Sequence, residues 1–220
     1  QMVKTYSKKK HGNKRLSAHF RLYEFACSDG TDTVKVSTTN LKMLEKIRAK
    51  FGGSITITSG NRSYAYNKKI GGASNSAHVT GRAVDFVVYD KKGKAVSGKK
   101  ICKYLESQKW KWGIGYMGNA THMDTKFTGN RMDETKKDKS DRNGYYTLQR
   151  HGQTFHTYFG SNFVVAASTL NIRKKPTTKS AVMGKLKKGQ KVKGQILDNW
   201  LKLGSGRYCC IKDKHGTYLK

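Results

Sequence analysis

The sequence predicts an α+β domain of helices and antiparallel hairpins, followed by a small all-β domain. Up to about residue 160, apolar stripes at helical spacing alternate with short β-branched segments. From Phe163 onward the helical period disappears, and short alternating strands are separated by turns. We therefore expect a basic flexible lead-in over 1–16, a first domain over 17–160 and a second over 161–220.

The elements of the first domain follow from local patterns. A helix is expected after the capping residues 38–40, because Leu41, Leu44 and Ile47 form an apolar stripe that ends before Gly52. Further helices are expected over 64–70 and after Ser97, and strands over 55–58, 83–89, 112–117 and 120–124. The charged stretch 128–145 is interpreted as an exposed excursion, and 145–158 as a closing hairpin.

Charge is the strongest compositional signal, because the sequence has 45 Lys and Arg residues and 14 Asp and Glu residues, which gives a formal net charge of +31. Such a chain attracts polyanions. The basic residues are spread along the whole sequence, which favours diffuse attraction to anionic wall polymers over sequence-specific nucleic-acid readout. The sequence contains no run of about 18 apolar residues, so it predicts no membrane-spanning helix. The four cysteines show no CxxC spacing and are expected to be free thiols.

The segment 76–86 carries the main chemical signal. His78 and Asp85 flank the turn Thr80–Gly81, and an aspartate on the apolar strand that follows is costly unless it is bound to something. His122 and Asp124 lie two residues apart on another strand and share a face. Three such ligands and a water would make a catalytic zinc site. From spacing alone, an ordinary His–Asp pair remains the alternative.

A family resemblance strengthens the zinc interpretation. The pattern Ser76-x-His78-x-x-Gly81-x-Ala83-x-Asp85 resembles the signature of the zinc D-Ala-D-Ala carboxypeptidase and LD-endopeptidase family, which shares its fold with the hedgehog signalling domain. The upstream segment Ser59-Gly60-x-Arg62-Ser63 and the later His122-Met123-Asp124 are similar to further motifs of that family. The resemblance covers about residues 19–126.

The resemblance implies roles for individual residues. His78, Asp85 and His122 would bind Zn²⁺, while Arg62 and Ser76 would contact substrate. Many relatives carry a carboxylate three residues before the last ligand, but that position here is Asn119, which cannot accept a proton. Asp124 is the preferred substitute as general base, with an orienting role for Asp124 as the alternative. Glu106 and Glu134 are the further candidates.

The second domain resembles the bacterial SH3-type wall-binding domain. Its opening Leu170-Asn171-Ile172-Arg173 through Pro176 and its later Gly184-x-Leu186-x-x-Gly189-x-x-Val192 are similar to that domain's motifs. A small barrel of this kind would offer Trp200, Tyr208 and Tyr218 to a binding groove. The alternative is that these aromatic residues belong to the core.

Together these resemblances predict a peptidoglycan hydrolase of the phage endolysin type. A zinc metallopeptidase domain would cut stem-peptide or cross-bridge amides, and the SH3-like domain would hold it on the wall. The enzyme is expected to be a monomer, made in the host cytoplasm without a signal peptide, which acts on the wall after release. The alternatives are a bacterial D-Ala-D-Ala carboxypeptidase or autolysin and a non-catalytic zinc-containing binder of wall or polyanion.

Overall fold

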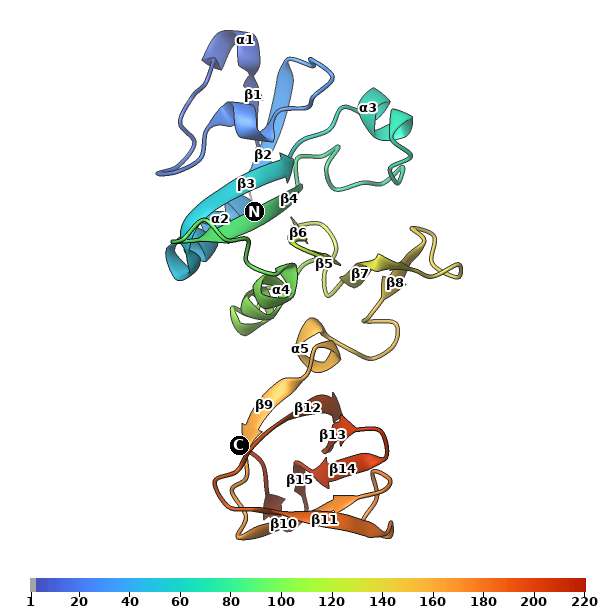
Figure 1. Cartoon of the computed structure of the whole chain (residues 1–220). Coiled ribbons are helices and arrows are strands. Elements are labelled where there is room, and N and C mark those ends of the chain that lie inside the picture. Colours follow the sequence, from blue (N-terminus) through green and yellow to red (C-terminus); the bar gives the residue numbers. More distant parts are fainter. Residues whose placement is uncertain (1–2) are drawn as a thin grey trace. The chain divides into compact units, whose positions relative to one another are not determined.

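The structure, a computed structural model, describes residues 3–220 and divides the chain into two compact units, Gln1–Gly152 and Gln153–Lys220 (Figure 1). The division falls at 152/153, whereas the sequence suggested 160/161. None of the helices in the described chain has the length and apolar character that a membrane crossing requires.

A six-stranded sheet forms the centre of the first unit. Its strands, in spatial order, are β3 (Gly52–Ser59), β4 (Ala83–Asp90), β6 (Ala120–Asp124), β5 (Ile114–Met117), β7 (Arg131–Lys137) and β8 (Tyr145–Thr147). Neighbouring strands are antiparallel except β5 and β7, which pair in parallel. The predicted α+β domain is therefore present as a mixed sheet, and the expectation of purely antiparallel strands is corrected at β7.

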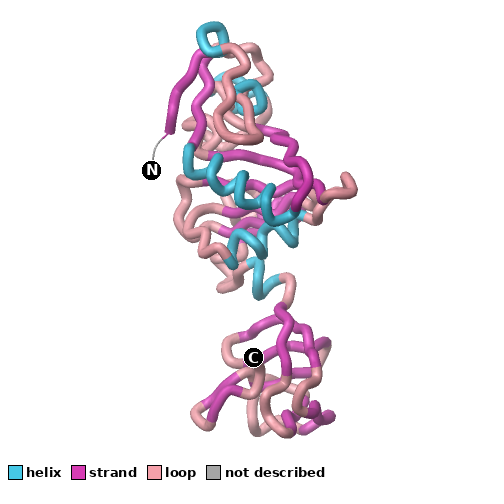
Figure 2. The backbone as a smooth tube through the Cα atoms, turned by 90° about the vertical axis from the view of Figure 1, so that its left-hand side faces the viewer, coloured by secondary structure: helices cyan, strands magenta, loops and turns pink. Residues whose placement is uncertain are grey.

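Two helices cover the sheet. Helix α2 (Thr38–Phe51) packs against β3 and β4, and α4 (Gly98–Ser107) packs against β5 and β6 (Figure 2). The α2 helix begins where the Ser37 hydroxyl accepts a hydrogen bond from the Asn40 N–H, and it ends at Gly52 in the left-handed region. Leu44 and Ile47 of α2 and Leu105 of α4 are fully buried, as the apolar stripes predict.

The N-terminal residues are folded. Strand β1 (Val3–Ser7) pairs with β2 (Thr33–Ser37), and helix α1 (Lys8–His11) follows β1 directly. The prediction of a flexible lead-in over 1–16 is therefore wrong for residues 3–11, while residues 1 and 2 lie outside the described residues. Backbone pairing with β2 stabilises this segment, which its basic composition did not indicate. Two short helices, η1 (Leu22–Phe25) and α3 (Tyr64–Lys69), complete the connections of this unit.

Strand β7 corrects the first part of the predicted exposed excursion over 128–145, whereas residues 135–144 are largely exposed, as expected. Arg131, Met132 and Asp133, near the start of this segment, are buried. The Arg131 guanidinium donates to the carbonyls of Trp110 and Trp112 and pairs with Glu106. Charged side chains with such partners can be buried at tolerable cost, so charge density alone misidentified a strand of the sheet as a loop.

The predicted hairpin over 145–158 is also corrected. Its first half is β8, but its second half is helix α5 (Phe155–Tyr158), which belongs to the second unit. The Thr154 hydroxyl accepts a hydrogen bond from the Thr157 N–H and caps this helix. Local capping therefore prevails over the aromatic alternation that suggested a strand.

The second unit is dominated by strands, as expected. A six-stranded sheet has the order β11 (Val182–Lys187), β10 (Thr169–Arg173), β14 (Arg207–Cys210), β13 (Trp200–Gly204), β12 (Lys191–Leu197) and β9 (Ser161–Val164). A short pair, β15 (Lys212–Asp213) and β16 (Gly216–Thr217), follows. Its core consists of Val165, Leu170, Leu201, Cys209 and Leu219. The SH3-type assignment of this unit stays a prediction.

All four cysteines, at positions 27, 102, 209 and 210, are free and buried. Burial raises the pKa of the Cys209 thiol to about 11, so little of the reactive thiolate is present near neutral pH.

We expect a thiol reagent at pH 8 to modify the native protein slowly and to modify all four cysteines after denaturation. Rapid modification of the native protein, measured by mass spectrometry, would contradict this packing.

Candidate metal centre

A row of residues crosses four strands of the first sheet. Asp85 on β4 lies directly opposite His122 on β6, and His122 lies directly opposite Gly115 on β5. Residues directly opposite one another in a sheet project to the same face. Ser59 on β3, opposite Asp85, extends the row on the other side. The strand register therefore brings one carboxylate and one imidazole together without any loop.

The third ligand comes from the loop before β4. Gly81 has φ +69°, in the left-handed region, and a Cβ there would lie within 2.6 Å of the Lys35 backbone. This tight turn returns the chain so that His78 faces Asp85. The loop is held by Asn61, whose side-chain amide donates to the His78 carbonyl at 2.8 Å, and by the Arg62 N–H, which donates to the same oxygen at 3.2 Å.

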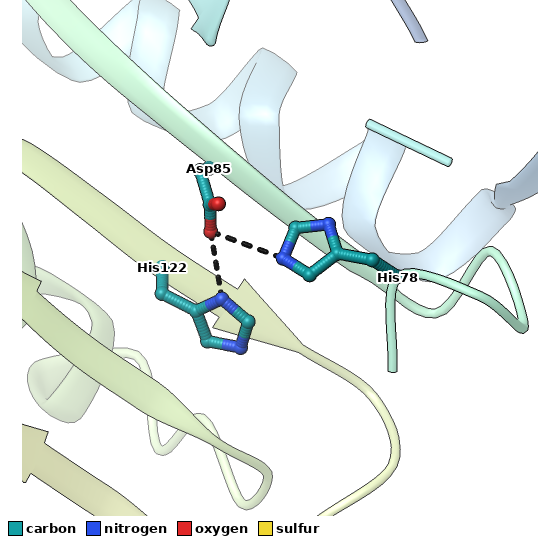
Figure 3. Close-up of side chains that lie close together, drawn as sticks. All are labelled: His78, Asp85 and His122. Atoms are coloured by element: carbon teal, nitrogen blue, oxygen red, sulfur yellow. Dashed lines mark hydrogen bonds and ion pairs between the residues drawn. The ribbon is translucent and has the colours of Figure 1, made fainter. Parts of the chain in front are cut away.

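Figure 3 shows the three side chains converging around one oxygen of Asp85. Asp85 Oδ1 lies 3.3 Å from His78 Nε2 and 2.7 Å from His122 Nδ1. All three residues are buried, and their ligand atoms lie within 4.8 Å of one another. Among the described residues this is the one cluster of three His, Cys, Asp or Glu side chains with that geometry.

The two imidazoles are oriented by their second nitrogens. His78 Nδ1 lies 2.7 Å from the Gly60 carbonyl, to which it donates, so Nε2 keeps its lone pair. His122 Nε2 lies 3.3 Å from Asp124 Oδ2. Donation from His122 Nε2 to this carboxylate makes Nδ1, the nitrogen that faces Asp85, the one that would bind a metal once its proton is displaced. Carbonyl and carboxylate partners of this kind fix metal-binding histidines in many proteins.

The charges of the cluster depend on each other. Burial opposes ionisation of Asp85, but His78 and His122 outweigh it and hold the pKa of Asp85 well below its usual range. Burial also disfavours the His122 imidazolium, yet Asp124 and Asp85 raise the pKa of His122 well above its usual value. An anionic cluster that stabilises an imidazolium in this way also favours a metal cation, whose binding would displace the proton.

The donor set fits zinc. Two imidazole nitrogens and one carboxylate oxygen are the ligands that catalytic zinc sites use, with the fourth position left for water or substrate. Tetrahedral ligands at the usual zinc distances lie about 3.3–3.5 Å apart, close to the 3.3 Å between Asp85 Oδ1 and His78 Nε2. The 2.7 Å between Asp85 Oδ1 and His122 Nδ1 is shorter than this spacing, so these residues can hold Zn²⁺ after an adjustment of the side chains.

Two glycines make room for two further carboxylates. A Cβ on Gly113 would lie 1.9 Å from Asp124 Oδ2, and a Cβ on Gly115 would lie 2.2 Å from Glu134 Oε1. The Gly115 position is also 2.8 Å from the His122 Cβ, so the Glu134 carboxylate lies over Gly115 beside this ligand. Any larger residue at 113 or 115 would displace one of these acids.

The cluster opens into a cavity of about 390 Å³. Arg62 and Ser76, the predicted substrate residues, both line it, as do His78, Asp85 and His122. Arg62 donates to Asp85 Oδ2 at 3.1 Å and to the Ser59 hydroxyl at 2.9 Å, so part of its guanidinium steadies a ligand. Strand β7, β8 and the loop between them add Met132, Glu134, Arg142, Asn143 and Tyr145 to the lining.

The candidates for general base separate clearly. Asp124 is fully buried, accepts the N–H groups of Lys126 and Phe127, and does not line the cavity, which favours the alternative orienting role over the role of general base. Glu106 pairs with Arg131, and Asn119 lies on an exposed turn. Glu134 alone of these candidates lines the cavity. Burial and, more weakly, Asp85 raise the pKa of Glu134 despite the opposing effect of His122.

The comparison with family models agrees with this geometry. Residues 18–124 match the model described as Peptidase M15, a family of zinc-dependent metallopeptidases. The match ends at Asp124, so it contains all three proposed ligands and Arg62 but none of β7, β8 or the second unit. No curated protein and no solved structure matches the chain significantly. The match supports the predicted metallopeptidase domain.

The ligand assignment predicts zinc content. We expect His78→Ala and His122→Ala to abolish zinc retention, because each leaves only two ligands, and Asp124→Asn to weaken zinc binding about 10–100-fold through misorientation of His122. His215→Ala, which removes an exposed histidine of the second unit, is the matched control. Metal analysis after dialysis and competition with a chelator would measure these effects. Full zinc occupancy in His122→Ala would contradict the assignment.

Proposed function

We propose that the chain is a zinc-dependent peptidoglycan hydrolase of the endolysin type, which cuts amide bonds of stem peptides or cross-bridges. The observation that carries the proposal is the buried convergence of His78, Asp85 and His122 at the bottom of an open cavity. The match of this same segment to Peptidase M15 supports it. A bacterial carboxypeptidase or autolysin would use the same chemistry, and cleavage of the terminal D-Ala-D-Ala bond would indicate the carboxypeptidase.

When bound, the metal would polarise the scissile carbonyl and acidify a water molecule. The protein's own residues do the rest. The carbonyl of Gly60 and the carboxylate of Asp124 hold the two imidazoles in their ligating orientation. Arg62 keeps Asp85 in place and presents its planar cationic group to the cavity, where it suits a substrate carboxylate or carbonyl. Ser76 on the cavity wall adds a hydroxyl for substrate contact.

Cleavage of purified cell walls tests this function. We expect the protein to lower the turbidity of a wall suspension and to release new amino groups. A chelator should abolish both effects, and added zinc should restore them. Mass spectrometry of the soluble muropeptides would identify the bond. Wall degradation unaffected by complete zinc removal would contradict the proposed chemistry, and lack of any cleavage across several wall types would favour a non-catalytic binder.

We further propose that the second unit binds the wall. Across β10, β14 and β13, Arg173 lies opposite Tyr208 and Tyr208 lies opposite Lys202. Trp200, two residues from Lys202, projects to the same face, whereas Leu201 and Cys209 project to the core. We name the residues Arg173, Trp200, Lys202 and Tyr208 the aromatic–basic face. Such a face combines stacking surface for sugars or peptides with attraction to anionic polymers.

Tyr218 is assigned differently. It packs against the core of the second unit, and its hydroxyl donates to Asp213. These contacts favour a structural role for Tyr218 over the wall contact suggested from the sequence. Asp213 and Asp198 are the acids of residues 153–220, against many Lys and Arg, so the attraction of this unit to polyanions is general.

The aromatic–basic face can be tested in the full-length chain. Replacing Trp200 and Tyr208 together by Ala should reduce binding to sedimented walls about tenfold or more, because aromatic contacts of this kind are typical binding hot spots. Hydrolysis of a small soluble peptide substrate should be unchanged. Tyr23→Ala, at an exposed tyrosine of the first unit, is the control. Undiminished wall binding by the double variant would remove this face from the proposal.

A further inference from the structure

We propose that Glu134 on β7 is the proton-transfer residue of the zinc site, supplied by a strand beyond the segment that matches Peptidase M15. This inference rests on the proposed peptidase function and names the group that was missing from it. Asp124, the base preferred from the sequence, is fully buried and does not line the cavity, so proton transfer needs another carboxylate that does.

The sheet register places Glu134 on the correct face. Met132 on β7 lies opposite Gly115, which lies opposite His122. Because side chains alternate along a strand, Glu134 projects to the same face as Met132 and therefore as His122. Since Gly115 has no side chain, the Glu134 carboxylate can extend over it toward the cavity, as the 2.2 Å between Oε1 and a Cβ at 115 indicates.

The surroundings of Glu134 leave it free to act. Within the described residues, its carboxylate and that of Asp85 are the two carboxylates that line the cavity, and Asp85 is committed as a ligand. No hydrogen bond or ion pair in residues 3–220 engages the Glu134 carboxylate. Asp133 next to it is instead buried and accepts from Thr135. A partly buried acid that faces a cavity without a partner is expected to exchange protons there.

The proton transfer balances as a hydrolysis. The Glu134 carboxylate accepts one proton from water while the water oxygen forms a bond to the scissile carbonyl carbon. The protonated Glu134 then gives this proton to the amide nitrogen as the carbon–nitrogen bond breaks. One water is consumed, a carboxyl group and an amine are formed, and Glu134 returns to its starting state with no change in oxidation.

The primary test is Glu134→Gln, which keeps the size of the side chain and removes its capacity to accept a proton. We expect kcat to fall about 10²–10⁴-fold while KM, bound zinc and wall binding stay at wild-type values. Glu134→Asp, which withdraws the carboxylate by one methylene, should retain an intermediate rate. Asp198→Asn, at an exposed acid of the second unit, is the matched carboxylate-to-amide control and should show the wild-type rate.

Two further variants separate a chemical role from a structural one. Gly115→Ala should displace the carboxylate and lower kcat at least tenfold. Because the added Cβ would also lie 2.8 Å from the His122 Cβ, bound zinc is measured in parallel and should stay at the wild-type level. Gly204→Ala should not lower kcat, since a Cβ at 204 meets no atom within 4 Å. Adding Asn119→Glu to Glu134→Gln should not restore activity, because position 119 lies on an exposed turn and outside the cavity.

The outcomes distinguish this inference from the proposed function. Suppose that the wild-type protein hydrolyses wall peptides and that the kcat of Glu134→Gln is within threefold of the wild-type value. This result would overturn the inference and leave the proposed function standing. Loss of zinc from Glu134→Gln would also overturn the inference, since Glu134 would then support the metal. Rescue by Asn119→Glu would also overturn it, because the proton could then be transferred from position 119. A wild-type protein that binds zinc but cleaves no wall peptide would overturn the proposed function together with the inference.

Discussion

The site depends on one cross-strand pair, Asp85 of β4 opposite His122 of β6. Their 2.7 Å contact is fixed by the register of the sheet, which is in turn fixed by the apolar alternation of Val84, Phe86 and Val88 on the opposite face. A slip of one residue would turn Asp85 into the apolar core and expose Phe86 to the cavity. The same packing that stabilises the domain therefore determines the geometry of the ligands, and only His78 must be brought in by a loop.

Glycine provides the space that this arrangement needs. Gly113, directly before β5, and Gly115 on β5 lie two residues apart, so both leave an empty position on the face that carries His122 and Asp124. Asp124 occupies the first position and orients a ligand, whereas Glu134 occupies the second and faces the cavity. Two acids of the same charge are thus kept in separate environments, one saturated with hydrogen bonds and one available for proton exchange.

The sequence indicated the ligands because each belongs to a strong local pattern. His78 and Asp85 flank a turn that needs Gly81, and the helix and strands around them have regular periods, so α2, α3, α4 and β3 to β6 were expected near their observed positions. Local sequence patterns could not predict the role of Asp124 or the position of β7 in the sheet. Whether Asp124 contacts water or orients His122 depends on the space that Gly113 leaves for its carboxylate. That neighbour is eleven residues away in the sequence and is apparent only in the folded structure. The burial of Arg131 depends on the carbonyls of Trp110 and Trp112, which lie about twenty residues away.

Strand β7 shows why a composition rich in charge can conceal a functional element. Arg131 satisfies the backbone of the segment before β5 and pairs with Glu106 of α4, which anchors β7 at the edge of β5. Once β7 is paired in parallel with β5, Glu134 necessarily lies three residues beyond that anchor on the face of the ligands. The buried ion pair at the start of β7 in this way positions the unpaired Glu134 carboxylate further along the strand. Hydrogen bonds to the backbone carbonyls and the ion pair with Glu106 offset the free-energy cost of burying Arg131. The segment that matches Peptidase M15 carries the candidate metal ligands, and the strand outside it carries the proposed acid.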